Sequence, residues 1–215
     1  MTRGAFITIE GAEGVGKTSS LEAIQAFLQN RGIDVRTTRE PGGTTLGEAV
    51  RSWILDGDHD DLSAEVEALL MFAARAEHLD KVIRPAIESG VWIVCDRFSD
   101  ATLAYQGGGR GAKPDFLRYL LEQVQDGLNP DLTILLDAPV EIGMARIAER
   151  PHDHFEREAL GFFKRVRQAY LDLAAEYPER IQIVDASASQ AEVLSSIENT
   201  LQSFCRRFEV PPRDG

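Results

Sequence analysis

Cysteine is scarce in this chain, and its two cysteines do not form a metal-binding pattern. Cys95 and Cys205 stand far apart, without the C-x-x-C spacing of a zinc site or a redox motif. Two isolated thiols are typical of proteins in a reducing compartment. We therefore expect a cytoplasmic protein that has no disulfide framework.

Long apolar runs are also missing. No stretch approaches the roughly 20 apolar residues that a helix needs to cross a bilayer. The N-terminus, Met1-Thr2-Arg3-Gly4, leads straight into a short apolar strand rather than into the apolar core of a signal peptide. We therefore expect neither membrane insertion nor export.

Positive charge is in deficit. The chain carries 23 Lys and Arg against 35 Asp and Glu, which gives a formal net charge of -12 at pH 7. A surface of this charge repels nucleic-acid backbones and anionic lipid headgroups, so we expect neither nucleic acid nor membrane as a partner. A small phosphorylated ligand is still compatible, because it needs only a local group of basic side chains.

The 215 residues alternate between two patterns. Short apolar runs rich in β-branched residues predict strands at Ala5–Ile9, Asp34–Thr38, Val91–Cys95, Leu132–Leu136 and Ile181–Val184. Helical patterns occupy Lys17–Asn30, Thr45–Leu55, Ser63–Ser89 with a kink at Pro85, Pro114–Gln125, Val140–Arg150, Glu156–Tyr177 and Ala191–Phe208. This alternation predicts an α/β fold of three layers, with a five-stranded parallel sheet and helices on both faces. We expect one domain over residues 1–209 and a flexible tail over 210–215.

A phosphate-binding loop follows the first predicted strand. The segment Gly11-Ala12-Glu13-Gly14-Val15-Gly16-Lys17-Thr18 matches G-x-x-x-x-G-K-[ST] at every fixed position and leads directly into a helix. In such a loop, backbone N–H groups converge on phosphate oxygens, Lys17 reaches the terminal phosphates, and the Thr18 hydroxyl can hold Mg²⁺. The segment predicts a P-loop NTPase-type fold that binds a nucleoside triphosphate.

A carboxylate and an arginine follow the third predicted strand. Asp96 and Arg97 lie at the carboxyl end of that strand, where open α/β sheets bind ligands. Asp96 can order the water around Mg²⁺, and Arg97 can hold a phosphate through two hydrogen bonds. A capping Asp beside a surface Arg is the alternative. No N-K-x-D guanine-binding motif occurs in the chain, which argues against a GTPase switch.

Several segments together resemble the thymidylate kinase family, and the resemblance extends to about Phe208. Besides the P-loop with its acidic Glu13, they are Arg39-Glu40-Pro41-Gly42-Gly43-Thr44, Phe72-Ala73-Ala74-Arg75 and Asp96-Arg97-Phe98 running to Ala104-Tyr105-Gln106-Gly107-Gly108-Gly109-Arg110. The resemblance implies a nucleoside monophosphate kinase that transfers the γ-phosphoryl group of Mg-ATP to dTMP, giving dTDP and ADP for dTTP biosynthesis. It also implies a homodimer, which is common in the family.

The chemistry of such a transfer agrees with the residues present. The acceptor is a phosphate oxygen whose second pKa is near 6, so it is largely an anion at neutral pH and needs no general base. Catalysis then consists of positioning and of neutralising negative charge, by Lys17, Mg²⁺ and arginines. Two alternatives stay open: the same reaction on another deoxynucleoside monophosphate, and a non-catalytic nucleotide-binding switch.

The resemblance also implies roles for individual residues. Arg97 and Arg51 match the arginines that hold the dTMP phosphate. Arg75 matches the arginine that donates to O4 of thymine, and a donor there opposes cytosine, which carries an amine at that position. The remaining matches are Thr102 and Gln106 at the thymine edge, Tyr105 against the deoxyribose, and Glu10 and Glu13 near the sugar and Mg²⁺. On the residues alone, a surface Arg51, a core Tyr105 and a loop Gln106 are the commoner roles.

Two positions depart from the family pattern. Many members have a stacking phenylalanine four residues before the base-binding arginine, whereas this chain has Met71 there and Phe72 next to it. Helix geometry allows either side chain to reach the base, and which of them stacks stays open. The usual serine of the family is replaced by Ala101, beside Thr102.

A small lid is implied at about residues 147–157. Some members carry an arginine inside the P-loop, but this chain has Glu13 and Val15 at those variable positions. The missing charge must therefore come from elsewhere, and the resemblance implies that it comes from the lid, which closes over the phosphates and expels water. We take Arg150 as the catalytic lid residue, with Arg146 and Arg157 behind it, while Arg146 can instead pack on the adenine of ATP.

Overall fold

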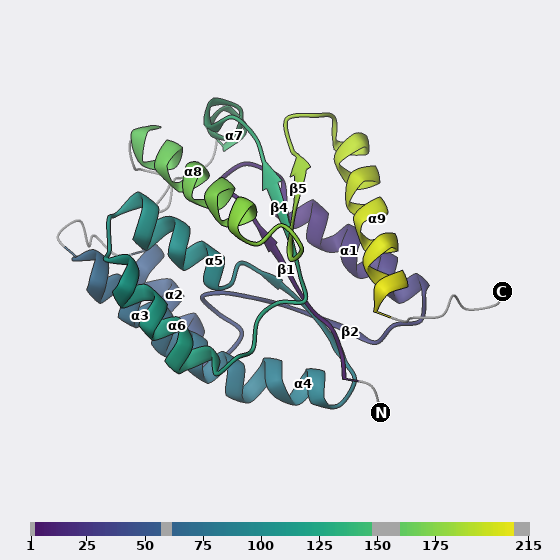
Figure 1. The fold of residues 1–215 in the computed structure, drawn as a ribbon, viewed down its shortest axis with the longest axis horizontal. Coiled ribbons are helices and arrows are strands. Elements are labelled where there is room, and N and C mark those ends of the chain that lie inside the picture. The colour runs from purple at the N-terminus through teal and green to yellow at the C-terminus, as the bar shows by residue number, and fades with distance from the viewer. Residues whose placement is uncertain (1–2, 57–61, 148–159, 209–215) are drawn as a thin grey trace.

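The structure, a computed structural model, describes residues 3–56, 62–147 and 160–208 (Figure 1). Its centre is a five-stranded parallel sheet with the strand order β2-β3-β1-β4-β5. The strands are β1 (Phe6–Glu10), β2 (Val35–Arg39), β3 (Trp92–Asp96), β4 (Leu132–Asp137) and β5 (Ile181–Asp185). Each predicted strand is present, with ends within one residue, so the predicted α/β fold with a parallel sheet is confirmed.

The helices also follow the predicted pattern, with two additions. They are α1 (Lys17–Asn30), α2 (Thr45–Asp56), α3 (Ala64–His78), α4 (Arg84–Glu88), α5 (Ser99–Thr102), α6 (Pro114–Gln125), α7 (Val140–Ile147), α8 (Leu160–Glu176) and α9 (Gln190–Arg207). Two π-helical segments, η1 (Leu79–Ile83) and η2 (Leu103–Gly109), join α3 to α4 and extend α5. Sequence analysis did not predict α5 or η2. Within the described residues, no helix has the length and apolar character needed to cross a membrane.

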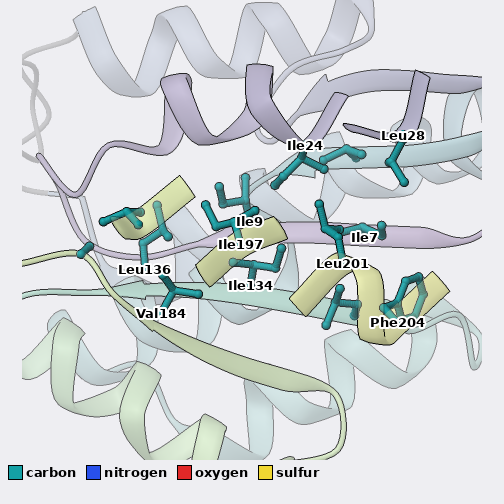
Figure 2. Packing of buried hydrophobic residues seen from close by; sticks show 14 of the residues in the cluster. Ile7, Ile9, Ile24, Leu28, Ile134, Leu136, Val184, Ile197, Leu201 and Phe204 are labelled. Carbon is teal, nitrogen blue, oxygen red and sulfur yellow. The ribbon is translucent and has the colours of Figure 1, made fainter. Parts of the chain in front are cut away.

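The main hydrophobic core lies between the sheet and helices α1 and α9, as Figure 2 shows. Side chains of a strand alternate between the two faces of a sheet. Ile7 and Ile9 of β1 therefore pack with Ile24 of α1 and Leu201 of α9, all fully buried. The alternate side chains of β1, including Thr8 and Glu10, point to the opposite layer. That layer contains α5 and α8 (Figure 1). The buried polar side chains of α5, Ser99, Asp100 and Thr102, belong to it.

The chain from Ala64 to Glu88 is one continuous helical run. Ser63 caps its start, because the hydroxyl accepts a hydrogen bond from the backbone N–H of Val66 at 3.3 Å. The sequence predicts a kink at Pro85, and the structure has the π-helical turn η1 there, which ends at Ile83, two residues before the proline. Proline cannot donate to the preceding turn, and its ring clashes with the carbonyl four residues back, so a wider turn relieves both problems.

The glycines at the end of η2 allow α8 to approach closely. A Cβ on Gly108 would lie 2.5 Å from Cβ of Ala169, and a Cβ on Gly109 would lie 2.5 Å from the ring of Phe162. Both neighbours belong to α8. A sequence of three glycines is typical of a loop, but here packing against α8 stabilises helical geometry. The segment that follows β3 is thereby held against the carboxyl edge of the sheet.

Candidate active site

The P-loop joins β1 to α1 at the carboxyl edge of the sheet. Gly14 and Gly16 have φ angles of 72° and 90°, which residues with a Cβ adopt only with strain. Lys17 is the first residue of α1, and its Nζ donates to the carbonyl oxygens of Gly11 and Ala12 at 3.2 and 2.8 Å. Burial lowers the pKa of Lys17. The loop thus has the strand–loop–helix geometry that its sequence predicts.

Arg97 reaches from the end of β3 to the P-loop. Its φ angle is 66°, a left-handed conformation that is uncommon outside glycine and that often marks a functional position. Nη1 donates to the carbonyl of Gly11 at 3.0 Å, and Nη2 donates to Oε1 of Glu13 at 2.5 Å. The guanidinium carbon lies 4.8 Å from the centre of the Tyr105 ring. The strained backbone therefore directs a cation at the phosphate-binding loop.

Glu13, inside the P-loop, is surrounded by donors. Besides Arg97, the Tyr105 hydroxyl donates to its Oε1 at 2.9 Å. Burial raises the pKa of Glu13, but the charges of Arg97 and Lys17 and the hydrogen bond from Tyr105 outweigh burial and lower it to about 2. The carboxylate is therefore ionised at neutral pH, and it links the P-loop to β3 and η2.

A cavity of about 680 Å³ opens beside the P-loop, within the usual range of ligand pockets. The predicted residues in its lining are Glu13, Gly14, Gly16, Lys17, Thr18, Arg51, Met71, Arg75, Asp96, Arg97, Thr102, Tyr105, Gln106 and Arg146. These residues come from segments that are far apart in the sequence, and the fold brings them together around one cavity.

The charge of the cavity contrasts with the charge of the chain. Its lining contains six cationic side chains, Lys17, Arg39, Arg51, Arg75, Arg97 and Arg146. Four acidic side chains share the lining, Glu13, Glu22, Glu40 and Asp96. A net positive cavity in a protein of net charge -12 attracts anions to this place and not to the surface in general.

Arg75 is a buried cation in the lining of the cavity, with 2% of its surface exposed. Its Nε donates to Oε2 of Glu40 at 2.7 Å, and Nη2 donates to the carbonyl of Phe98 at 3.1 Å and to Oγ1 of Thr102 at 2.9 Å. Nη1 is buried and has no hydrogen-bond partner among the described residues. A buried donor without a partner costs about 1–3 kcal/mol. The arrangement thus fixes the guanidinium and leaves one donor for an acceptor from outside the protein.

Met71 and Phe72 have different surroundings. Met71 lines the cavity, whereas Phe72 is 2% exposed and packs with Ala68 and Leu117. The guanidinium carbon of Arg75 lies 4.9 Å from the centre of the Phe72 ring. Of the two side chains, Met71 is therefore the one placed to contact a ligand, and Phe72 supports Arg75.

Glu10 lies behind the cavity and not in its lining. Its Oε1 accepts from the backbone N–H of Phe98 at 2.7 Å, and its Oε2 accepts from the Tyr170 hydroxyl at 2.8 Å. Burial and repulsion from Asp100 raise the pKa of Glu10 to about 7. The other predicted residues outside the lining are Gly11, Ala12, Val15 and Phe72.

Arg146 is the predicted lid-side residue that the structure describes. Its Nη1 donates to the carbonyl of Ala186 at 3.0 Å and to that of Gly14 at 3.4 Å, so it lies against the P-loop from α7. Arg150, Arg157 and nearly all of the predicted lid lie outside the described residues.

Asp96 and Thr18, the predicted magnesium residues, both line the cavity. Oδ1 of Asp96 is buried and has no hydrogen-bond partner in the described part of the chain. Over the same residues, no group of three or more His, Cys, Asp or Glu side chains is placed to hold a metal ion. Mg²⁺ usually takes one or two protein oxygens together with waters and phosphates. A hydroxyl and an unpaired carboxylate oxygen therefore fit Mg²⁺ in the company of a nucleotide.

The predicted site residues did not include Tyr170, Arg39 or Glu40. Tyr170 accepts a hydrogen bond from Nη1 of Arg97 at 3.3 Å, but the two residues are 73 positions apart and no local pattern connects them. Arg39 and Glu40 line the cavity. Their place directly after a predicted strand was a usable signal, because carboxyl ends of parallel strands bind ligands.

The comparisons with known proteins agree on one family. The sequence model described as thymidylate kinase matches residues 9–197. The thymidylate kinase of Alkalilimnicola ehrlichii is 51% identical over 97% of both chains, and that of Nitrosomonas europaea is 51% identical over 95% of both. The crystal structure of thymidylate kinase from Ehrlichia chaffeensis superposes with a TM-score of 0.74 at 32% identity, covering 93% of this chain and 99% of that one.

Proposed function

The chain belongs to the thymidylate kinase family, whose reaction transfers the γ-phosphoryl group of ATP to dTMP, and from this premise we propose how its cavity divides between the two nucleotides. The triphosphate of ATP binds the P-loop with Lys17. The base of dTMP binds at the opposite end, against Arg75 and Met71. The two phosphate ends then meet between Arg97 and Asp96. Both ends belong to one continuous cavity, which supports an in-line transfer between bound nucleotides.

The observation that carries this division is the buried Nη1 of Arg75, which has no partner among the described residues. Thymine offers an acceptor, O4, where cytosine offers an amine. A fixed N–H donor accepts thymine and leaves cytosine facing it with a second donor. Hydrogen-bonding sites of this kind reject a mismatched ligand strongly, because a buried group then loses its partner.

The test of this division is a panel of acceptors offered to the purified protein with Mg-ATP: dTMP, dUMP, dCMP, dGMP, AMP and UMP. We expect turnover with dTMP, weaker turnover with dUMP, and negligible turnover with the others. The variant Arg75→Gln should lower kcat/KM for dTMP by a factor of 100 or more while KM for ATP changes less than threefold. The exposed Arg118, changed to Gln, is the matched control. Equal loss for dTMP and ATP would contradict the division.

Thr18 and Asp96 are the residues that would hold Mg²⁺. The ion, when bound with ATP, neutralises phosphate charge. The residues of the chain do the remaining work: Lys17 and Arg97 hold phosphate oxygens in place, and Glu13 fixes the guanidinium of Arg97. We expect Asp96→Asn to raise the Mg²⁺ concentration for half-maximal activity at least tenfold. An unchanged Mg²⁺ requirement would remove Asp96 from this role.

Arg51 and Arg39 complete the positive end that receives the dTMP phosphate. Nη1 of Arg51 donates to the Pro41 carbonyl at 3.3 Å, and burial lowers the pKa of its guanidinium. Arg39 pairs with the exposed Glu48 at 2.8 Å. Both guanidinium groups belong to residues that line the cavity, so both are placed to bind a phosphate near the transfer point. Arg150, from the lid, adds the charge that this P-loop does not carry.

We also propose a homodimer that forms through helices α2 and α3. Four of the eight large apolar side chains that are exposed in the described residues lie there: Leu46, Trp53, Val66 and Leu69. The two helices lie side by side in Figure 1 and pack together. Clusters of exposed apolar side chains mark interaction surfaces. Light scattering after size exclusion should give twice the chain mass, and Leu69→Glu should shift it towards the monomer.

The reaction takes place in the cytoplasm in this proposal. Cys95 and Cys205 are both buried free thiols, which suits a reducing compartment. Fractionation of cells that produce the protein should recover it with cytoplasmic markers.

A further inference from the structure

Glu67 is a buried carboxylate on α3 for which the mechanism above has no role. Its side chain is 1% exposed. Its Oε1 accepts a hydrogen bond from Nε2 of Gln106 at 2.5 Å, and its Oε2 lies 3.0 Å from Nε of Arg110. Gln106 is itself 1% exposed and lines the cavity. The carboxylate therefore lies between a cation at the end of η2 and an amide at the cavity.

The orientation of the Gln106 amide follows from the charge of Glu67. An ionised carboxylate accepts hydrogen bonds and cannot donate them. The Arg110 guanidinium lies beside Oε2, and Nε2 of Gln106 is the amide atom that faces Oε1. Only the NH₂ side of the amide can then face Glu67, because the other orientation would bring two acceptors together. The carbonyl oxygen of Gln106 is thereby the amide atom that does not face Glu67.

We propose that the Glu67–Arg110 pair contributes to the selection of thymine over cytosine, because it fixes the Gln106 amide with its carbonyl oxygen towards the base. This inference rests on the proposed binding of the thymine edge by Arg75 and Gln106. Thr102, which holds Arg75, is one helical turn before Gln106 along α5 and η2, so the two contacts lie on the same face. Glu67 is a positioning residue here and touches no substrate.

The resulting pattern matches thymine and opposes cytosine at two points. Thymine presents N3–H as a donor beside O4 as an acceptor, whereas cytosine presents N3 as an acceptor beside an amine. Arg75 supplies the donor for O4, and Gln106 supplies the acceptor for N3–H. If the amide could rotate, its NH₂ group would serve cytosine N3 equally well. Fixing the amide therefore removes a binding mode that the glutamine by itself would allow.

The experiment compares dissociation constants of dTMP and dCMP, measured by calorimetry on the full chain. In Glu67→Gln the residue at position 67 can donate as well as accept, so the Gln106 amide is free to rotate. We expect the ratio of the dCMP constant to the dTMP constant to fall about tenfold or more, with KM for ATP unchanged. Glu65→Gln makes the same chemical change on the same helix, away from the cavity lining, and should stay within twofold of the original ratio.

Gln106→Ala separates this inference from the proposal on which it rests. If Gln106→Ala lowers the ratio of the dCMP constant to the dTMP constant and Glu67→Gln does not, the positioning role of Glu67 is wrong while the base-binding role of Gln106 stands. If neither variant changes the ratio, the placement of the thymine edge at Gln106 fails, and this inference fails with it. A merely structural role for Glu67 would weaken both ligands equally and leave the ratio unchanged.

A second variant covers the case in which Glu67→Gln does not fold. Arg110 is 16% exposed and closer to the surface. Arg110→Met removes the guanidinium that holds Oε2 of Glu67, so the carboxylate can turn away and no longer fixes the Gln106 amide. The ratio of the dCMP dissociation constant to the dTMP dissociation constant should again fall severalfold. A folded Arg110→Met protein that keeps the original ratio would overturn the inference.

Discussion

The contact between the P-loop and α7 can be tested with three glycine-to-alanine changes. A Cβ on Gly14 would overlap the carbonyl oxygen of Gly143 and lie 2.6 Å from its carbonyl carbon, and Gly14 also has a positive φ angle of 72°. A Cβ on Gly143 would overlap the carbonyl oxygen of Glu13. Gly127 has a φ angle of 76°, but nothing lies within 4 Å of its Cβ position. Gly14→Ala therefore introduces both backbone strain and overlap, Gly143→Ala introduces overlap alone, and Gly127→Ala introduces strain alone.

The expected losses of stability follow from these environments. Left-handed strain costs about 1–2 kcal/mol for a residue with a Cβ, which is the full effect expected for Gly127→Ala. Overlap with a backbone that cannot rotate away costs about 1–3 kcal/mol. Gly143→Ala should lose somewhat less than that, because alanine gains up to about 1 kcal/mol in a helix. Gly14→Ala combines both costs, and we expect about 2–5 kcal/mol.

Urea unfolding measures the loss of stability, and steady-state kinetics measure the effect on kcat/KM for ATP. Gly14→Ala and Gly143→Ala should both lower kcat/KM for ATP at least tenfold, because a loop shifted by about 1 Å no longer fits the phosphates. Gly127→Ala should leave that value unchanged, although it loses stability. A Gly143→Ala protein as stable and as active as the original would refute the close packing of the P-loop against α7.

Three further predictions concern charge. Glu10 has a pKa of about 7 when folded, above its ordinary 4.5, so the folded protein binds the extra proton and stability should fall as pH rises from 4.5 through 7. Glu10→Gln should flatten that fall in unfolding free energy between pH 5 and 8, and an unchanged slope would contradict the raised pKa. Glu13, at about 2, contributes stability above pH 4.5 that is lost as pH falls towards 2, so Glu13→Gln should lose less stability between pH 4.5 and 3 than the original protein. Arg180 holds the buried Asp100 through two hydrogen bonds of 2.6 and 3.0 Å, so Arg180→Met should cost about 3–5 kcal/mol in urea unfolding, and a loss below about 1 kcal/mol would show that the pair is not needed.

The elements that sequence analysis predicted well are those whose signals are local. Helix α1 begins at Lys17 and ends at Asn30 as predicted, because the P-loop glycines precede it and a glycine turn follows it. The strands were found from short apolar runs, and burial of β1 and β4 on both faces explains why the runs of these two strands are nearly continuous. Segment η2 was missed because its glycines favour a loop, whereas in the fold Gly108 and Gly109 pack closely against α8. Segment α5 was missed because it has only four residues, too few for a helical pattern.

The sequence by itself determined the fold class, the P-loop and the family, because each depends on spacing within a short segment or on the order of such segments. Only the tertiary structure decided how the side chains are paired. Arg75 is fixed by Glu40, 35 residues away, and Gln106 is fixed by Glu67, 39 residues away. The structure also placed Met71 in the cavity and Phe72 beneath Arg75. Such contacts depend on how helices pack over the sheet, and packing is a property of the whole chain rather than of any segment within it.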